Sequence, residues 1–448
     1  MRYDNPVGFK LFCLAVLVLF GAPKINIHLG SIPVYLIDVL LIATLYHAQK
    51  SAVPVKLKQF KGLVHLFVIL VIINELLNGI LLGSLAQPLY MVFRMTLAVS
   101  MVYLVPKFCF DRKHILGILR YACYGGLITA VLLVLSSLPG TRSISLLVLS
   151  NPYLEPNALS VSRHLMEQGN VGIRGASLVG VSILSGSYLN VIWPLLFLLR
   201  RSYEQKVLEK YLLNITIVVM FFGLLFTYSR GVILGAFLII IMIIIQRDVR
   251  YRGVLISMVI LAYSLISYIG VDSRFFYFDR IVERTEAVLD NPYDDERETE
   301  RILAYVQPWP HLLNNPSYLL IGEGWARHKI SGVKAIEGNE VRGERADHAL
   351  FAAAYYSYGL FGAILLLYFY FNTIQLTVRM QKASRARSSF VYQLSKTLFL
   401  VLLGMSTWIA FDHGAISSPR GAMLMFFVFG LVASQSFILE SEYNKYSS

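Results

Sequence analysis

The chain has 448 residues, of which 56% are hydrophobic and only 15% charged, and its mean hydropathy is +0.61. Apolar runs recur near the length of about 20 residues that a helix needs to cross hydrocarbon. This composition excludes a soluble globular protein and predicts an all-α polytopic membrane protein. The net charge of +13 would suit a nucleic-acid-binding protein, but the placement of the basic residues described below excludes that class.

The apolar runs predict about twelve transmembrane helices in chain order. They cover residues 8–23, 31–47, 63–83, 88–105, 115–138, 176–199, 211–228, 231–246, 253–270, 349–373, 394–411 and 421–439. Lys and Arg concentrate in alternate short connections, at residues 50–61, 107–113, 200–210, 247–252 and 379–387. Because short cytoplasmic loops carry the excess of basic residues, this pattern predicts that both termini are cytoplasmic.

The same topology divides the chain into five units. We expect a five-span bundle, an extracytoplasmic loop, spans six to nine, a large extracytoplasmic loop, and three final spans with a cytoplasmic tail, at residues 1–138, 139–175, 176–270, 271–347 and 348–448. Amphipathic patterns at 281–289 and 298–313 predict two helices inside the large loop. Loops of this length are more often functional than not. Cys13, Cys109 and Cys123 are expected to be free thiols, since their spacing fits neither a disulfide framework nor a metal site.

Four local patterns follow one another along the chain. They are Gly-Ile-Arg-Gly-Ala-Ser at 172–177, Thr-Tyr-Ser-Arg-Gly at 227–231, Arg-Ile-Leu-Ala-Tyr at 301–305 with Asn-Pro at 315–316 and Leu-Ile-Gly-Glu-Gly at 320–324, and Asp-His-Ala-Leu at 347–350 with Gly-Leu-Phe-Gly at 359–362. In order and spacing they resemble the O-antigen ligase and O-antigen polymerase superfamily over roughly residues 170–370. The first 140 residues resemble it only as generic spans.

The resemblance implies an all-helical glycosyltransferase of the GT-C type in the bacterial inner membrane, acting at its outer face. It implies an undecaprenyl-diphosphate-linked glycan as donor and as acceptor, with membrane lipid around both. A chain-length regulator and a flippase are further partners that it admits, and nucleic acid is not among them. The residue after the histidine is Ala349, where the ligases usually carry Asn, Ser or Gln. This departure favours polymerisation of repeat units of O-antigen, capsule or exopolysaccharide over ligation to lipid A core.

The chemistry assigns roles to four residues. Arginine donates bidentate hydrogen bonds to phosphate oxygens and never deprotonates, so Arg174, Arg230 and Arg301 are candidates for binding the diphosphate, and Arg230 also for stabilising it as it leaves. His348 is the candidate general base for the acceptor hydroxyl. Direct attack by that hydroxyl would invert the anomeric carbon. Secondary candidates are Arg163, Arg297, Asp347, Glu323 and Tyr355.

We expect no metal and no other cofactor, since the sequence has neither an Asp-x-Asp pair nor a histidine cluster with ligand spacing. Structural alternatives remain open for each residue. Arg230 would also serve as a topology anchor, Arg174 as a partner of Glu155 or Glu167, and Arg301 as part of a solvated helical face. His348 would also serve as a structural histidine at the N-terminus of a helix that Asp347 caps.

Two ionisable residues fall inside predicted spans. Glu75 and Arg94 should face protein, a cavity or each other, because a charge facing lipid is costly. They would line a groove for the polyprenyl chain or form an ion pair between two helices. A transporter of lipid-linked oligosaccharide remains an alternative of another class. It is less favoured, because the chain has no internal repeat.

Overall fold

The computed structural model describes residues 5–29, 32–50, 61–81, 83, 85–137, 141, 144, 148, 177–179, 182–202, 207–227, 229–245, 319–320, 322, 324, 350–411 and 419–447. The helices of this part of the chain are α1 (Pro6–Gly21), α2 (Leu36–Gln49), α3 (Lys61–Leu81), α4 (Ala86–Phe108), α5 (Arg112–Ser137), α8 (Ser182–Ser202), α9 (Val207–Leu225), α10 (Arg230–Ile245), α17 (Leu350–Ser384), α18 (Ser389–Phe411) and α20 (Pro419–Ser447). Two strands, β1 (Asn26–Leu29) and β2 (Ile32–Tyr35), form an antiparallel hairpin.

The predicted all-α membrane architecture is confirmed. Among the described helices, α3, α4, α5, α9, α17, α18 and α20 are long and apolar enough to cross a bilayer, and α1, α2 and α10 are shorter apolar helices. Eleven of the twelve predicted spans correspond to described helices, and the predicted span at 253–270 lies outside the described residues. The two helices predicted at 281–289 and 298–313 also lie outside them.

Two predicted spans start several residues before their helices, and the helix predicted to end at residue 373 continues to Ser384. The span predicted from residue 31 begins as strand β2, and its helix starts only at Leu36. Ile32 and Val34 are β-branched residues at alternate positions, which suits a strand. The backbone N–H of Leu36 donates to the Ile25 carbonyl at 3.0 Å and so joins the hairpin to the start of α2. The span predicted from 176 begins at Ser182, because Ser177 first forms a turn in which its Oγ accepts from the Val179 N–H.

Short polar contacts set the helix starts at the other side. Pro6 opens α1, and the Asn5 side chain accepts from the Gly8 N–H while donating to the His47 carbonyl at 2.7 Å. This links the start of α1 to the end of α2. The Asp111 carboxylate caps the first turn of α5 by accepting from the His114 N–H at 2.8 Å. Side-chain capping of free N–H groups is a common way to begin a helix.

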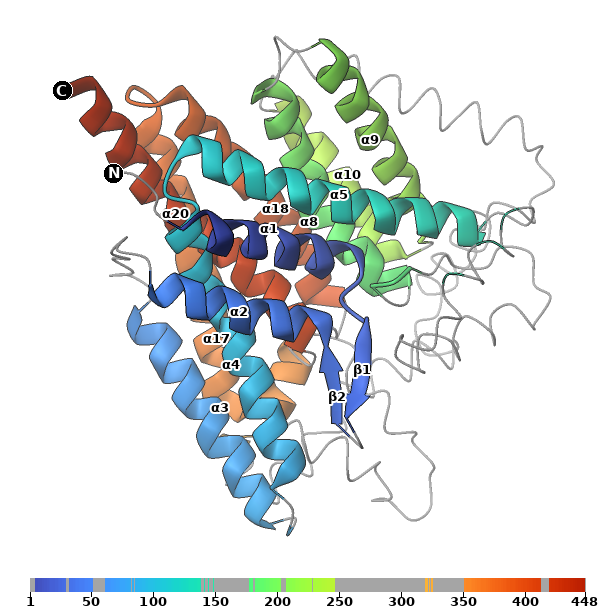
Figure 1. The fold of residues 1–448 in the computed structure, drawn as a ribbon, viewed down its shortest axis with the longest axis vertical. Coiled ribbons are helices and arrows are strands. Elements are labelled where there is room, and N and C mark those ends of the chain that lie inside the picture. The colour runs from blue at the N-terminus through green and yellow to red at the C-terminus, as the bar shows by residue number, and fades with distance from the viewer. Residues whose placement is uncertain are drawn as a thin grey trace, which may run out of the picture.

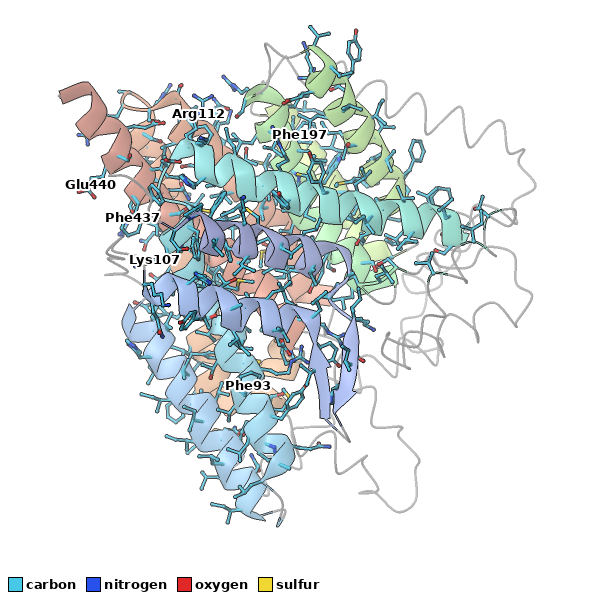
Figure 2. The ribbon with its side chains drawn as sticks, in the orientation of Figure 1. Phe93, Lys107, Arg112, Phe197, Phe437 and Glu440 are labelled. Carbon is cyan, nitrogen blue, oxygen red and sulfur yellow. The ribbon has the colours of Figure 1, made fainter. Side chains whose placement is uncertain are left out.

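The bundle has two distinct ends. Both chain termini lie at one end, and the β1–β2 hairpin lies at the other ends of α1 and α2 (Figure 1). We call these the terminal end and the hairpin end. Lys107, Arg112 and Glu440 lie on the side of the termini (Figure 2). Their position fits the predicted topology, in which the basic connections and both termini share the cytoplasmic side.

Close helix contacts build the core. The most extensive pairings are α4 with α20 and α1 with α5. Gly125 of α5 lies against Gly21 and the Leu17 carbonyl of α1, and Thr129 donates from Oγ1 to the Phe20 carbonyl at 2.7 Å. Small residues of this kind let transmembrane backbones approach closely.

All three cysteines are free, as predicted, and all three are buried. Burial raises the pKa of the Cys109 thiol, beyond the end of α4, well above its ordinary value. The thiol therefore stays protonated and unreactive at neutral pH.

Substituting Gly125→Ala should destabilise the bundle, because an added Cβ would lie 2.6 Å from the Leu17 carbonyl oxygen. Overpacking of this kind costs about 1–3 kcal/mol. Gly62→Ala is the matched control, since its Cβ would meet nothing within 4 Å. Thermal unfolding in detergent should show a lower midpoint for Gly125→Ala only. Equal midpoints would contradict the α1–α5 contact described above.

Candidate functional site at the hairpin end

The candidate site is built around the four sequence motifs, and the structure describes the residues next to the candidate side chains. Arg230 is the first residue of α10 and Tyr355 lies on α17, but their side chains lie outside the described residues. The remaining candidates are outside the described residues altogether: Arg163, Arg174, Arg297, Arg301, Glu323, Asp347 and His348. Their convergence on one cavity therefore stays a prediction. The serines, glycines and helix starts next to them are described.

The first two motifs meet on neighbouring residues of α8. Ser177, three residues after Arg174 in the chain, shares a 2.8 Å hydrogen bond with Ser185. At the next residue, Gly186, an added Cβ would lie 2.6 Å from Val232 and 2.8 Å from Thr227. The turn that carries Arg230 thus packs on α8 beside the turn that follows Arg174. The start of α8 brings the two arginine motifs together.

The turn before Arg230 is held by its own polar groups. Thr227 Oγ1 donates to the Leu224 carbonyl at 2.7 Å and accepts from the Ser229 N–H at 3.3 Å. The Ser229 carbonyl then accepts from the Ile233 N–H at 2.9 Å, the first hydrogen bond of α10. Arg230 therefore stands in the first turn of a helix, where the exposed N–H groups already favour an anion.

The third and fourth motifs meet at a break in α17. Gly359 has φ 66° and ψ −170°, so the helical hydrogen-bond pattern is interrupted there. The Ser357 carbonyl accepts instead from the Gly324 N–H at 3.1 Å and from Asn74 Nδ2 at 2.9 Å. One carbonyl thereby joins the Gly-x-Gly turn of the large loop, the span after His348, and α3.

We call this contact the glycine latch, formed by Asn74, Asn78, Gly322, Gly324, Ser357 and Gly359. The two loop glycines have φ angles of +77° and +74°. An added Cβ on Gly322 would lie 2.5 Å from the Gly359 nitrogen, and one on Gly324 would lie 2.6 Å from Asn78 Nδ2. Both positions need glycine for backbone conformation and for space.

The latch reaches below the hairpin-end surface. Asn74 lies seven residues before the end of α3, which corresponds to about 10 Å along the helix. The end of α3 belongs to the hairpin end, since α4 begins at Ala86 and its Tyr90 donates to the Pro33 carbonyl of β2 at 2.8 Å. The Gly-x-Gly turn is thus inserted among helices at the hairpin end.

Glu75 and Arg94 face protein, as predicted, with exposed fractions of 0% and 4%. The ion pair of Arg94 is with Asp38 of α2, however, with Nε and Oδ2 2.9 Å apart. Glu75 lies instead within electrostatic range of Tyr358, next to the latch. The sequence concealed the Asp38–Arg94 pair, because the two residues are far apart in the chain and Asp38 lies in an apolar segment.

Aromatic rings surround the Asp38–Arg94 pair. The Arg94 guanidinium lies 4.0 Å from the centre of the Tyr35 ring and 5.7 Å from that of Tyr90. The Arg420 guanidinium, at the start of α20, lies 5.5 Å from the same Tyr35 ring. We call Tyr35, Asp38, Arg94 and Arg420 the arginine cluster. Tyr188 connects it to α8, since its hydroxyl donates to the Arg420 carbonyl at 2.9 Å.

Residues 215–367 match the family model described as O-Antigen ligase. This segment resembles the O-antigen ligases. The match runs from α9 into α17 and includes three of the four motifs, so the resemblance to the O-antigen ligase and polymerase superfamily is confirmed. A search of curated proteins finds no match to the chain.

Three elements of the site were not foreseen from the sequence: the latch asparagines, Asp38 and Arg420. The spacing of Asn74 and Asn78, four residues apart in an otherwise apolar span, was a usable signal, because polar residues inside a span usually face protein. Within the described ranges, no group of three or more His, Cys, Asp or Glu side chains is placed to hold a metal ion.

Gly322→Ala should abolish or strongly reduce product formation, because the added Cβ would press on the backbone at Gly359 and displace the Gly-x-Gly turn. Gly83→Ala is the matched control: its φ of +66° is also positive, but an added Cβ would meet nothing within 4 Å. Both variants carry the left-handed backbone penalty of about 1–2 kcal/mol, so any difference reports the contact. An in vitro assay of glycan transfer, made after expression of both variants has been checked, measures this difference in activity. Equal activity of the two variants would contradict the role of the latch.

Proposed function

We propose that this protein polymerises undecaprenyl-diphosphate-linked oligosaccharide repeat units at the outer face of the bacterial inner membrane. In this proposal the hairpin end faces the periplasm or the cell exterior, and both termini are cytoplasmic. The observation that carries the proposal is the match of residues 215–367 to the O-antigen ligase family model. The pairwise meeting of the motifs at the hairpin end supports it.

The donor diphosphate is assigned to Arg174, Arg230 and Arg301. The placement of Arg230 supports this role, because a guanidinium at the start of α10 adds to the positive end of the helix and creates a strong preference for an anion. Arginines on one cleft would hold the diphosphate and stabilise the charge that grows on it as it leaves. No metal ion is required for this step.

The reaction is a single displacement. The acceptor hydroxyl oxygen forms a bond to the anomeric carbon of the donor sugar while the bond from that carbon to the diphosphate oxygen breaks. The hydroxyl proton passes to His348, and undecaprenyl diphosphate is released with inversion at the anomeric carbon. Neutral imidazole is largely available as a base at neutral pH. The latch supports this role, since it fixes the span that begins two residues after His348.

The second candidate function is ligation of finished glycan to lipid A core. The description of the matching family favours it, and the same donor chemistry serves both reactions. Ala349, directly after His348, favours polymerisation. A transporter of lipid-linked oligosaccharide is the alternative of another class.

The glycolipids of a deletion strain separate these functions. Loss of a polymerase should leave a single repeat unit on lipid A core, because each repeat unit is still flipped and is still transferred once by the ligase. Loss of a ligase should leave polymer on undecaprenyl diphosphate. Accumulation of repeat units on the cytoplasmic side would contradict both and support the transporter. Gel analysis of labelled glycolipids, with complementation by the wild-type chain, distinguishes the outcomes.

Arg230→Lys and His348→Ala should fail in different ways. The lysine variant keeps the charge but loses the bidentate fork, so binding of the lipid donor should weaken and polymer formation should fall. The alanine variant should bind the donor normally and lose about 10² to 10⁴ in turnover, the usual contribution of general-base assistance. Measurements of donor affinity and polymer yield in nanodiscs distinguish the two variants.

The wild-type enzyme should keep its turnover in excess chelator, because arginines are proposed to carry the charge of the leaving group.

Wild-type activity in one of these variants would rule out the role proposed for the substituted residue. Full activity in Arg230→Lys would make that arginine a topology anchor. Full turnover in His348→Ala would make the histidine structural and would direct testing to Asp347 and Glu323. Abolition of activity by chelator with rescue by Mg²⁺ or Mn²⁺ would contradict the metal-free step.

A further inference from the structure

We propose that Asn190 of α8 is the positioning residue for Arg230. Its side-chain amide fixes the first turn of α10, and through that turn it holds the arginine in place for the diphosphate. The inference rests on the proposed function only for what Arg230 does there, because the contact between Asn190 and α10 is argued from the described residues.

The first argument is the hydrogen bond itself. Asn190 is 1% exposed, and its Nδ2 donates to the Val232 carbonyl at 2.9 Å. Val232 follows Arg230 by two residues and belongs to the first turn of α10. Asn190 therefore binds the backbone of the turn that carries the arginine, and it does so from another helix.

The second argument is that α8 holds Val232 at two levels. Gly186 lies four residues before Asn190 on α8, and an added Cβ at Gly186 would lie 2.6 Å from the Val232 side chain. The side chain of Val232 thus packs on Gly186, while its carbonyl is bound by Asn190. These two contacts are about 6 Å apart along α8. Together they define both the height and the rotation of the first turn of α10.

The third argument is the close packing around the amide. Helices α8, α10 and α18 pack against one another (Figure 1). An added Cβ on Gly235 of α10 would lie 2.6 Å from Asn190 Nδ2 and 2.5 Å from Thr407 Oγ1 of α18. An added Cβ on Gly404 of α18 would lie 3.2 Å from the Asn190 carbonyl oxygen. The two glycines let three backbones close around the amide, which leaves it little room to turn away from Val232.

The fourth argument is that the amide is a costly way to join two helices. Asn190 Oδ1 is buried and has no hydrogen-bond partner within the part of the chain that the structure describes. The Val232 carbonyl belongs to the helical ladder of α10 and does not depend on Asn190 for a partner. An apolar side chain at position 190 would leave no unpaired acceptor. The asparagine is thus better explained by the direction that it imposes on α10 than by stability.

The position of Arg230 matters because this arginine is proposed to act on charge that develops during the reaction. A donor that stabilises a leaving group has to be in place beforehand, and a misplacement of about 1 Å can cost about 10²-fold in rate. Binding of the diphosphate before the reaction depends less on exact geometry. Loss of the Asn190 amide should therefore lower kcat more than it raises the KM of the donor.

Asn190→Ala removes the amide, and Asn190→Ser is a milder variant, because a serine hydroxyl is too short to reach α10 and bonds within its own helix. Thr129→Val is the matched control, since it also removes a buried hydrogen bond to a carbonyl of another helix, that of Phe20. In kinetics of glycan transfer in nanodiscs, only the Asn190 variants should lose kcat, by about 10- to 100-fold. An equal loss in Thr129→Val, or wild-type kcat in a folded Asn190→Ser, would overturn the proposal.

A double-mutant cycle tests whether Asn190 acts through Arg230. Arg230→Lys already removes the bidentate fork, so adding Asn190→Ala to it should cost less than about 3-fold further. A merely structural asparagine would cost the same factor in both backgrounds, because independent substitutions are additive in free energy. Additive effects of the two substitutions would therefore overturn the proposal.

Hydrogen exchange separates failure of this proposal from failure of the proposed function, because it requires no activity. The Ile233 N–H donates to the Ser229 carbonyl at 2.9 Å, and a peptide that contains it should exchange faster in Asn190→Ala, while peptides of α1 should not change. Unchanged exchange with wild-type kcat, in a protein that transfers glycan, would remove the role of Asn190 alone. Faster exchange in a wild-type chain background that transfers no glycan would remove the polymerase and ligase assignments alone.

Discussion

The arrangement of the hairpin end depends on one carbonyl group that has lost its helical partner. Inside a bilayer, water does not reach the hydrocarbon region, so every backbone polar group needs a partner from protein. The break at Gly359 makes the Ser357 carbonyl available, and Gly324 and Asn74 donate to it. A single carbonyl, freed by the break in α17, thus fixes where the Gly-x-Gly turn inserts and which face of α3 it meets.

The two ends of the bundle differ in the kind of polar group that they bury. The terminal end has capping groups: Asn5 accepts from the Gly8 N–H and donates to the His47 carbonyl, and Asp111 accepts from the His114 N–H and contacts its ring. The hairpin end has a break in a helix, a first-turn arginine and two guanidinium groups on one tyrosine ring. Capping stabilises a fold, whereas buried charge costs stability unless something else compensates it. This difference supports the proposal that the site lies at the hairpin end.

Much of the fold was accessible from the sequence, because spans are determined by local composition. Hydropathy predicted eleven described helices within a few residues in most cases, and the Ser-Arg-Gly pattern correctly indicated a turn that starts a helix at Arg230. The hairpin was missed because Ile32 and Val34 are as apolar as a span. Asp38 and Arg94 were not paired, since nothing local connects α2 with α4. The latch was invisible for the same reason: Asn74 and Gly324 meet only through the tertiary fold.

The glycine latch also limits how modular this protein is. The family match ends within α17 and begins within α9, so it contains the Gly-x-Gly turn and the Gly359 break but not α3. Asn74, which donates to the Ser357 carbonyl, and Asn78, which lies beside Gly324, belong to α3 and so lie outside the matched segment. A chimera that exchanged residues 215–367 between relatives would separate the turn from the surface that receives it. The matched segment and α3 therefore have to vary together. Substitutions of Asn74 and Asn78 are expected to accompany substitutions of Gly322 and Gly324 during evolution.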